Sequence, residues 1–86
     1  MEKYVKQIIK ACGKEADYVV VLKMDKVMEA IERLKSELKG LIDFGGLYMK
    51  GIFNGIELNI FRTGKILVKG IENEEDLKRI LNKIFS

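Results

Sequence analysis

The chain has 86 residues, a formal net charge of +3, about half apolar residues and about one third charged residues, a composition typical of one small folded domain. It has no histidine and one cysteine, Cys12, which excludes histidine catalysis, an internal disulfide and a cysteine-based metal site. No apolar run approaches the roughly 20 residues that span a bilayer, and N-terminal lysines interrupt any signal-peptide pattern. We therefore expect a single cytoplasmic domain, residues 1–86, without cofactors.

Residues 2–13 are predicted to form an additional N-terminal helix. Apolar residues recur there at helical spacing: Tyr4, Val5, Ile8, Ile9 and Cys12. Lysines lie between them, and Gly13 is a suitable stop. Cys12 is expected to be a small buried residue of this helix rather than a reactive thiol.

Residues 17–23 are predicted to form a strand, because the segment YVVVL is rich in β-branched residues. Its continuous apolar run indicates that both faces are at least partly buried. A helix over residues 25–39 is expected next, with Asp25 as N-cap and Gly40 at its end. Residues 41–44 are a candidate short strand.

Residues 44–71 are predicted to form a three-strand antiparallel meander. Asn54-Gly55 lies between two alternating runs, which is the strongest short-range hairpin signal, and Thr63-Gly64 makes the second turn. Strand alternation separates two faces. One face is apolar and needs a cover: Leu47, Met49, Ile56, Leu58, Ile60, Ile66 and Val68. The other mixes lysines with large apolar groups: Tyr48, Lys50, Glu57, Asn59, Phe61, Lys65, Leu67 and Lys69.

A last helix is predicted after Asn73, which is a favourable N-cap and is followed by three acidic residues suited to the helix dipole. Its apolar stripe is Leu77, Ile80, Leu81, Ile84 and Phe85. The elements together predict an α+β fold of two layers, in which an antiparallel sheet of four to five strands carries helices on one face.

From residue 17 onward, this order resembles one repeat of the TATA-box-binding protein family, in which two repeats form a saddle. The run IFRTGKILVKG at residues 60–70, followed by NEED at 73–76, is similar to the family's IF-x-x-GKMV-x-x-G and S/N-E-E/D signature. Phe44 and Phe61 have the seventeen-residue spacing of the two family phenylalanines that wedge between base steps. The same half-repeat also resembles the N-terminal domain of ribonuclease HIII.

The chain departs from the family pattern in three respects. It has one repeat, so a saddle would need two chains. Asn59, Leu67 and Lys69 stand where the family has Leu, Val and Thr. Residues 1–13 have no counterpart in the repeat.

The resemblance implies a non-catalytic module that binds nucleic acid, either DNA or an RNA–DNA hybrid, on the uncovered face. In that module Phe44 and Phe61 would stack on bases or wedge between them. Asn59 would form a hydrogen bond with a base edge, and Leu67 would lie on the same face. Phosphates would be neutralised by Lys50, Lys65 and Lys69. Residues 44–70 carry four cations against Glu57 alone, which fits a polyanion partner.

Other interpretations stay open. Phe61 can instead pack in a protein interface, and strand lysines can simply prevent aggregation. Glu57 counts against a polyanion, so the alternative function is a protein–protein interaction module on the same face. Residues 17–23 form an apolar edge, which predicts a homodimer through that strand unless the N-terminal helix covers the edge and keeps the chain monomeric.

Overall fold

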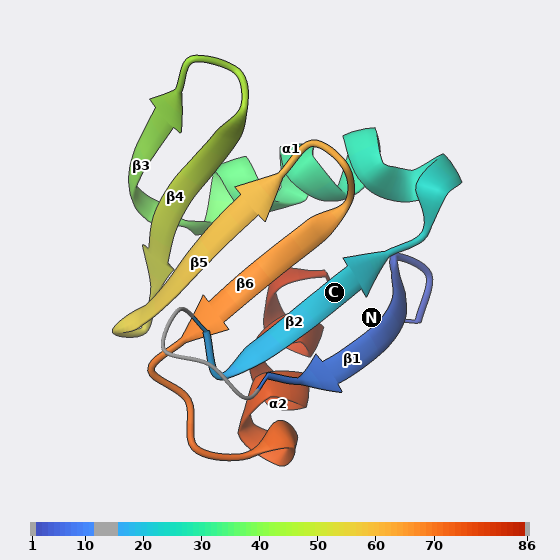
Figure 1. The fold of residues 1–86 in the computed structure, drawn as a ribbon, viewed down its shortest axis with the longest axis vertical. Helices are drawn as coiled ribbons and strands as arrows, with labels where there is room; N and C mark the ends of the chain where they lie inside the picture. Colours follow the sequence, from blue (N-terminus) through green and yellow to red (C-terminus); the bar gives the residue numbers. More distant parts are fainter. Residues whose placement is uncertain (1, 12–15, 86) are drawn as a thin grey trace.

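The computed structural model describes residues 2–11 and 16–85. The elements of this part of the chain are the strands β1 (Val5–Lys10) and β2 (Tyr18–Leu22), the 3₁₀ turn η1 (Met24–Lys26), the helix α1 (Val27–Glu37), the strands β3 (Lys39–Phe44), β4 (Tyr48–Phe53), β5 (Ile56–Phe61) and β6 (Lys65–Lys69), and the helix α2 (Glu74–Ile84) (Figure 1). The fold is α+β, as predicted, but its sheet has six strands rather than four to five.

The strands form one antiparallel sheet in the order β1-β2-β6-β5-β4-β3. The pairing of β2 with β6 joins segments that are distant in sequence. Beyond the ladder itself, the Asp17 amide donates to the Val68 carbonyl at 2.8 Å and the Leu22 amide to the Gly64 carbonyl at 2.7 Å. The Asp17 carboxylate also accepts from the Gly70 amide at 2.7 Å. These hydrogen bonds of Asp17 hold the start of β2 against the end of β6.

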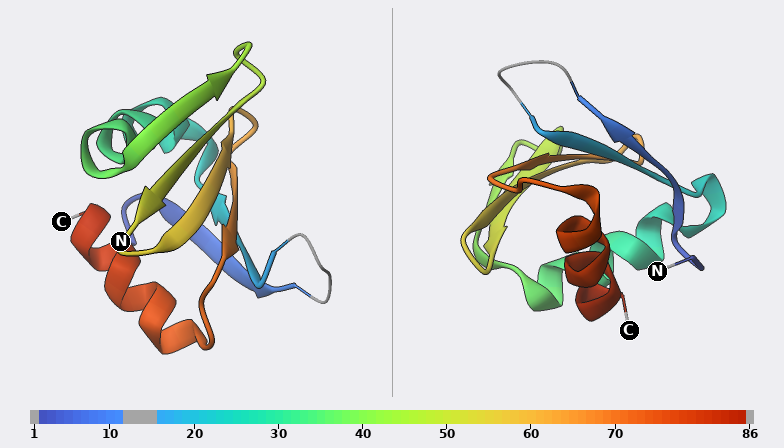
Figure 2. Two further views of the ribbon diagram at one scale, coloured as in Figure 1. Left: turned by 90° about the vertical axis from the view of Figure 1, so that its left-hand side faces the viewer. Right: turned by 90° about the horizontal axis from the view of Figure 1, so that it is seen from below.

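Both helices lie on one face of the sheet (Figure 2). The strand residues beneath them are at most 1% exposed: Val20, Leu58, Ile60, Ile66 and Val68. The helices contribute Leu34 of α1 and Leu77 and Leu81 of α2, all fully buried. This confirms the predicted covered face, with one exception: Leu47 lies in the turn before β4 and is 76% exposed. In the described part, no helix is long and apolar enough to cross a membrane.

Local sequence explains most element boundaries. The Asn73 side chain accepts from the Asp76 amide at 2.9 Å, so α2 starts as predicted. Asn54 and Gly55 have φ of 50° and 79°, the left-handed pair that a two-residue hairpin turn requires. Gly40 was expected to end a helix, but it follows the start of β3 with φ 61° at a bulge. The preceding helix is accordingly shorter than predicted.

The start of α1 also differs from the prediction. Met24–Lys26 form a 3₁₀ turn, and α1 begins at Val27 without a side-chain cap. Asp25 therefore lies within the 3₁₀ turn instead of capping the helix.

The predicted N-terminal helix is wrong, because Val5–Lys10 is the strand β1, paired with β2. A register shift between Val5 and Gln7 leaves Val5 opposite Leu22 and Ile8 opposite Val20. Since Leu22 and Val20 both face the core, two residues three positions apart point inward, which imitates helical spacing. Cys12 and Gly13 lie outside the described residues.

The predicted homodimer through residues 17–23 is not supported. Hydrogen-bonded neighbours flank β2 on both sides, β1 on the outer side and β6 on the inner side. The edge that a second copy would need is therefore occupied. The N-terminal segment covers this edge, as the alternative interpretation required, but as a strand.

Candidate nucleic-acid interface

The sheet face opposite the helices, called here the open face, carries three aromatic side chains that form a row. Phe44 of β3 pairs with Tyr48 of β4, which pairs with Phe61 of β5. Ring centroids are 4.6 Å apart for Phe44 and Tyr48, and 5.1 Å apart for Tyr48 and Phe61, with interplanar angles of 14° and 19°. These spacings match the distance between neighbouring strands. The rings therefore stack face to face across the sheet, and we call them the aromatic row.

The aromatic row brings together the two phenylalanines that the sequence singled out. Phe44 is 39% exposed and Phe61 is half-buried. Gly45 and Gly46 do not turn Phe44 toward the core. Phe61 lies away from both helices, as the alternation of β5 predicted.

Tyr48 is the site residue that sequence reasoning missed. The sequence assigned it to the uncovered face but not to the candidate site, because the family spacing points only to phenylalanines. The signal was present in the register: a hairpin turning at Asn54-Gly55 places position 48 opposite position 61. Tyr48 therefore lies between the two phenylalanines and touches both rings.

A polar network lies in the middle of the open face. The Lys50 ammonium is 3.3 Å from one Glu57 carboxylate oxygen, and the Asn59 amide donates to the other at 3.1 Å. The hydrogen bond from Asn59, and then that from Lys50, hold the pKa of Glu57 below its usual range. Glu57 is thus charged at neutral pH and holds the side chains of two predicted site residues, Lys50 and Asn59.

Strand β6 supplies the remaining predicted site residues. Lys65 and Lys69 are exposed at its two ends, with half-buried Leu67 between them. Among the residues that the structure describes, neither lysine forms a salt bridge. The Lys65 ammonium is therefore available to phosphate. The Lys50 ammonium is shared with Glu57, and Lys69 lies across the strands from Glu57, where its positive charge helps to lower the pKa of that carboxyl.

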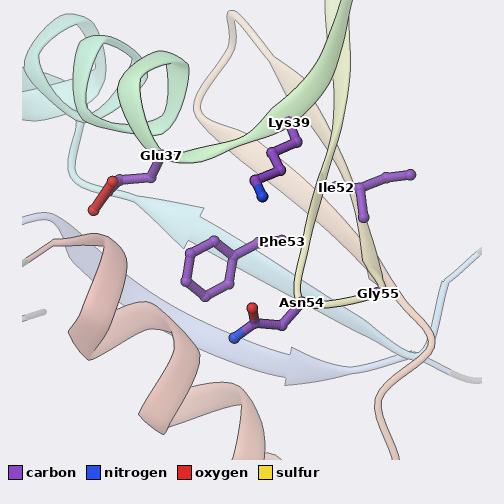
Figure 3. Close-up of a pocket in the computed structure, with 6 residues that line it drawn as sticks. All are labelled: Glu37, Lys39, Ile52, Phe53, Asn54 and Gly55. Atoms are coloured by element: carbon purple, nitrogen blue, oxygen red, sulfur yellow. The ribbon is translucent and has the colours of Figure 1, made fainter.

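A separate hollow of about 270 Å³ lies where the β4–β5 turn approaches the end of α1 (Figure 3). Its lining residues are Glu37, Lys39, Ile52, Phe53, Asn54 and Gly55. In Figure 3, Phe53 points toward the helix side and Ile52 points the other way. The hollow holds no nucleophile with a neighbouring base. Within residues 2–11 and 16–85, no cluster of His, Cys, Asp or Glu could hold a metal ion.

A family model described as Transcription factor TFIID (or TATA-binding protein, TBP) matches residues 16–86. No curated protein and no solved structure matches the chain. The matched residues include β2 to β6 and both helices, and they exclude β1. The open face therefore lies largely within the matched part, and β1 is an addition to it.

Proposed function

The chain belongs to the TATA-binding protein family, whose fold is a DNA-binding one, and we propose that it is a non-catalytic module that binds nucleic acid through the open face. The observation that supports the proposal best is the aromatic row with Lys65 as the neighbour of Phe61 on β6, on the same face as Lys69. Aromatic rings stack on bases, and lysines neutralise phosphates.

Each predicted site residue has a role in this proposal. Phe44 and Phe61 stack on bases or wedge between them. Lys65 and Lys69 contact phosphates, and Leu67 lies between them as an apolar contact. Lys50 and Asn59 join when nucleic acid competes with Glu57 for their donors.

The test is an electrophoretic titration of the chain against single-stranded DNA, duplex DNA, RNA and an RNA–DNA hybrid at two salt concentrations. Two or three phosphate contacts predict that the logarithm of affinity falls with the logarithm of salt with a slope of roughly −1.5 to −3. Absence of binding to all four nucleic acids at about 50 mM salt would rule the proposal out.

A protein–protein interaction module is the second candidate, and one observation favours it. Large apolar side chains are exposed on and beside the β3–β4 hairpin: Leu41, Ile42, Leu47 and Ile52. Exposed apolar patches are typical of protein interfaces. Binding through them would depend little on salt, so the same pair of salt concentrations separates the two candidates when a protein partner is titrated.

A further inference from the structure

We infer that the open face selects single-stranded nucleic acid over duplex, with unpaired bases extending the aromatic row at its two ends. This inference rests on the proposed function and specifies its ligand. Three features support it: the stacking within the row, the position of the β6 lysines, and the shape of the sheet.

The stacking leaves two ring faces for a ligand. Tyr48 has a phenylalanine on each side, at 4.6 and 5.1 Å between ring centroids. Phe44 and Phe61 each have one ring face covered by Tyr48. The other face of Phe44 lies at the edge of the sheet, and the other face of Phe61 lies toward Lys65 of β6. A base that stacks on an outer face requires no rearrangement of the row, and an unpaired base has a free face to offer. Insertion of one ring into a duplex base step would instead break its contact with Tyr48.

The two ends of the aromatic row differ in their surroundings. Phe44 lies on β3, which is an edge strand, so in residues 2–11 and 16–85 no further strand lies beyond its outer face. Phe61 faces β6, where Lys65 precedes Ile66, the residue that pairs with Ile60. Lys65 is therefore the neighbour of Phe61 across the strands. A base on the outer face of Phe61 brings its own phosphate close to the Lys65 ammonium.

The shape of the sheet disfavours a duplex. In the right-hand view of Figure 2 the sheet arches over the helices, so the open face lies on the outer side of the arch. A stiff duplex touches such a surface along a narrow strip, whereas a flexible single strand can follow it. A concave saddle would need a second repeat joined at β2, and β1 occupies that edge.

The test measures fluorescence anisotropy of the full chain with a labelled single strand of about 12 nucleotides, within the usual site sizes, and with the same sequence as a duplex. We expect the single strand to bind about tenfold tighter or more. Tyr48→Leu is expected to weaken single-strand binding roughly 5-fold, because the phenylalanines lose their support, and Tyr48→Phe is expected to retain it.

The outcomes separate the inference from the function on which it rests. A duplex that binds as tightly as the single strand overturns the inference and leaves the proposed function standing. Binding of neither nucleic acid overturns the inference, and it overturns the proposed function as well when RNA and the RNA–DNA hybrid also fail to bind. Ile9→Ala is the matched control, because Ile9 is exposed on the same face, opposite Val19, but far from the aromatic row. A loss in Ile9→Ala equal to that in Tyr48→Leu would also overturn the inference.

Discussion

The two edge strands of the sheet, β1 and β3, are alike in length but differ in what holds them. Each has six residues and an irregular register against its neighbour. β1 directs Val5 and Ile8 against the core, and Lys6 and Lys10 stand exposed along it. All six residues of β3 are exposed. β1 thus belongs to the folded core, whereas β3 presents its side chains to solvent.

The residue before β1 strengthens this difference. Tyr4 is 6% exposed, and its ring lies 5.0 Å from the Phe85 ring between centroids. Its carbonyl accepts from the Lys23 amide at 2.8 Å. Core packing therefore holds one edge, whereas at the other edge Phe44 stacks on Tyr48 on the exposed side of the sheet. Mutations at the first edge should change stability, and mutations near the second should change binding.

The largest expected effect is on stability at the β1 edge. Tyr4→Ala should lower the free energy of unfolding by about 3 kcal/mol, because it empties a buried aromatic site. Phe44→Ala, at the β3 edge, should cost less than about 1.5 kcal/mol, the range for one exposed aromatic pair. Urea unfolding of both variants measures the difference. Equal losses of unfolding free energy in the two variants would mean that the two edges contribute equally to stability.

The next effect is on binding at the aromatic row. Phe61→Ala should weaken nucleic-acid binding by roughly 1–3 kcal/mol, the range for losing a base–aromatic stack. Ile9→Ala, on the β1 end of the open face, should leave the affinity within about twofold. Anisotropy titrations at low salt compare the variants. Unchanged affinity in Phe61→Ala would favour the interaction-module alternative.

Glu57→Gln should strengthen binding. The substitution removes the negative charge from the polar network of the open face and releases the Lys50 ammonium. Affinity for nucleic acid should rise roughly three- to tenfold, because one unit charge near a phosphate is worth about 1 kcal/mol. The pKa of Glu57 is lowered, so the carboxylate stays charged until the pH falls below the range in which a glutamate usually takes up its proton. Affinity of the unmodified chain should then rise toward that of Glu57→Gln, while the network's contribution to folding is lost.

The pH series needs one comparison to be decisive. Affinity of Glu57→Gln should not rise over the same acidic interval, because it has no carboxylate to protonate at this position. A parallel rise in both proteins would assign the pH dependence to another group.

The smallest effect concerns a single phosphate contact. Lys69→Ala should reduce the steepness of the salt dependence by about one unit. Lys10→Ala is the control, because Lys10 pairs with the core-facing Tyr18 and therefore does not lie on the open face. Titration at several salt concentrations gives both slopes. An equal reduction in the two variants would indicate diffuse charge attraction rather than a defined contact.

Strand alternation made the sheet faces predictable, because Leu58, Ile60 and Val68 keep a strict period of two and are all buried. The same rule failed at β1, where a register shift after Val5 placed inward residues three apart. Short-range signals cannot distinguish such a bulged strand from a helix, since the deciding contact is with β2, more than ten residues away.

The candidate site was predictable in its backbone positions but not in its side-chain partners. The hairpin at Asn54-Gly55 put Phe61 on the open face. The ring contact with Tyr48 depends on rotamers, and the capture of Lys50 and Asn59 by Glu57 depends on side chains reaching across β4 and β5. Those choices are made by the folded neighbours rather than by local propensity.

The pairing of β2 with β6 has a consequence for the order in which the chain folds. The other strand pairs join neighbours in sequence, so each closes a short loop, whereas Asp17 meets Gly70 across 53 positions. Closing so long a loop costs conformational entropy, and the contacts that offset this cost form only after closure. The meander from β3 to β6 is therefore expected to form early, and docking of the β1–β2 hairpin onto β6 to limit the folding rate. Pulsed hydrogen exchange during refolding would show this as protection of β5 amides before those of β2; simultaneous protection would instead indicate one concerted step.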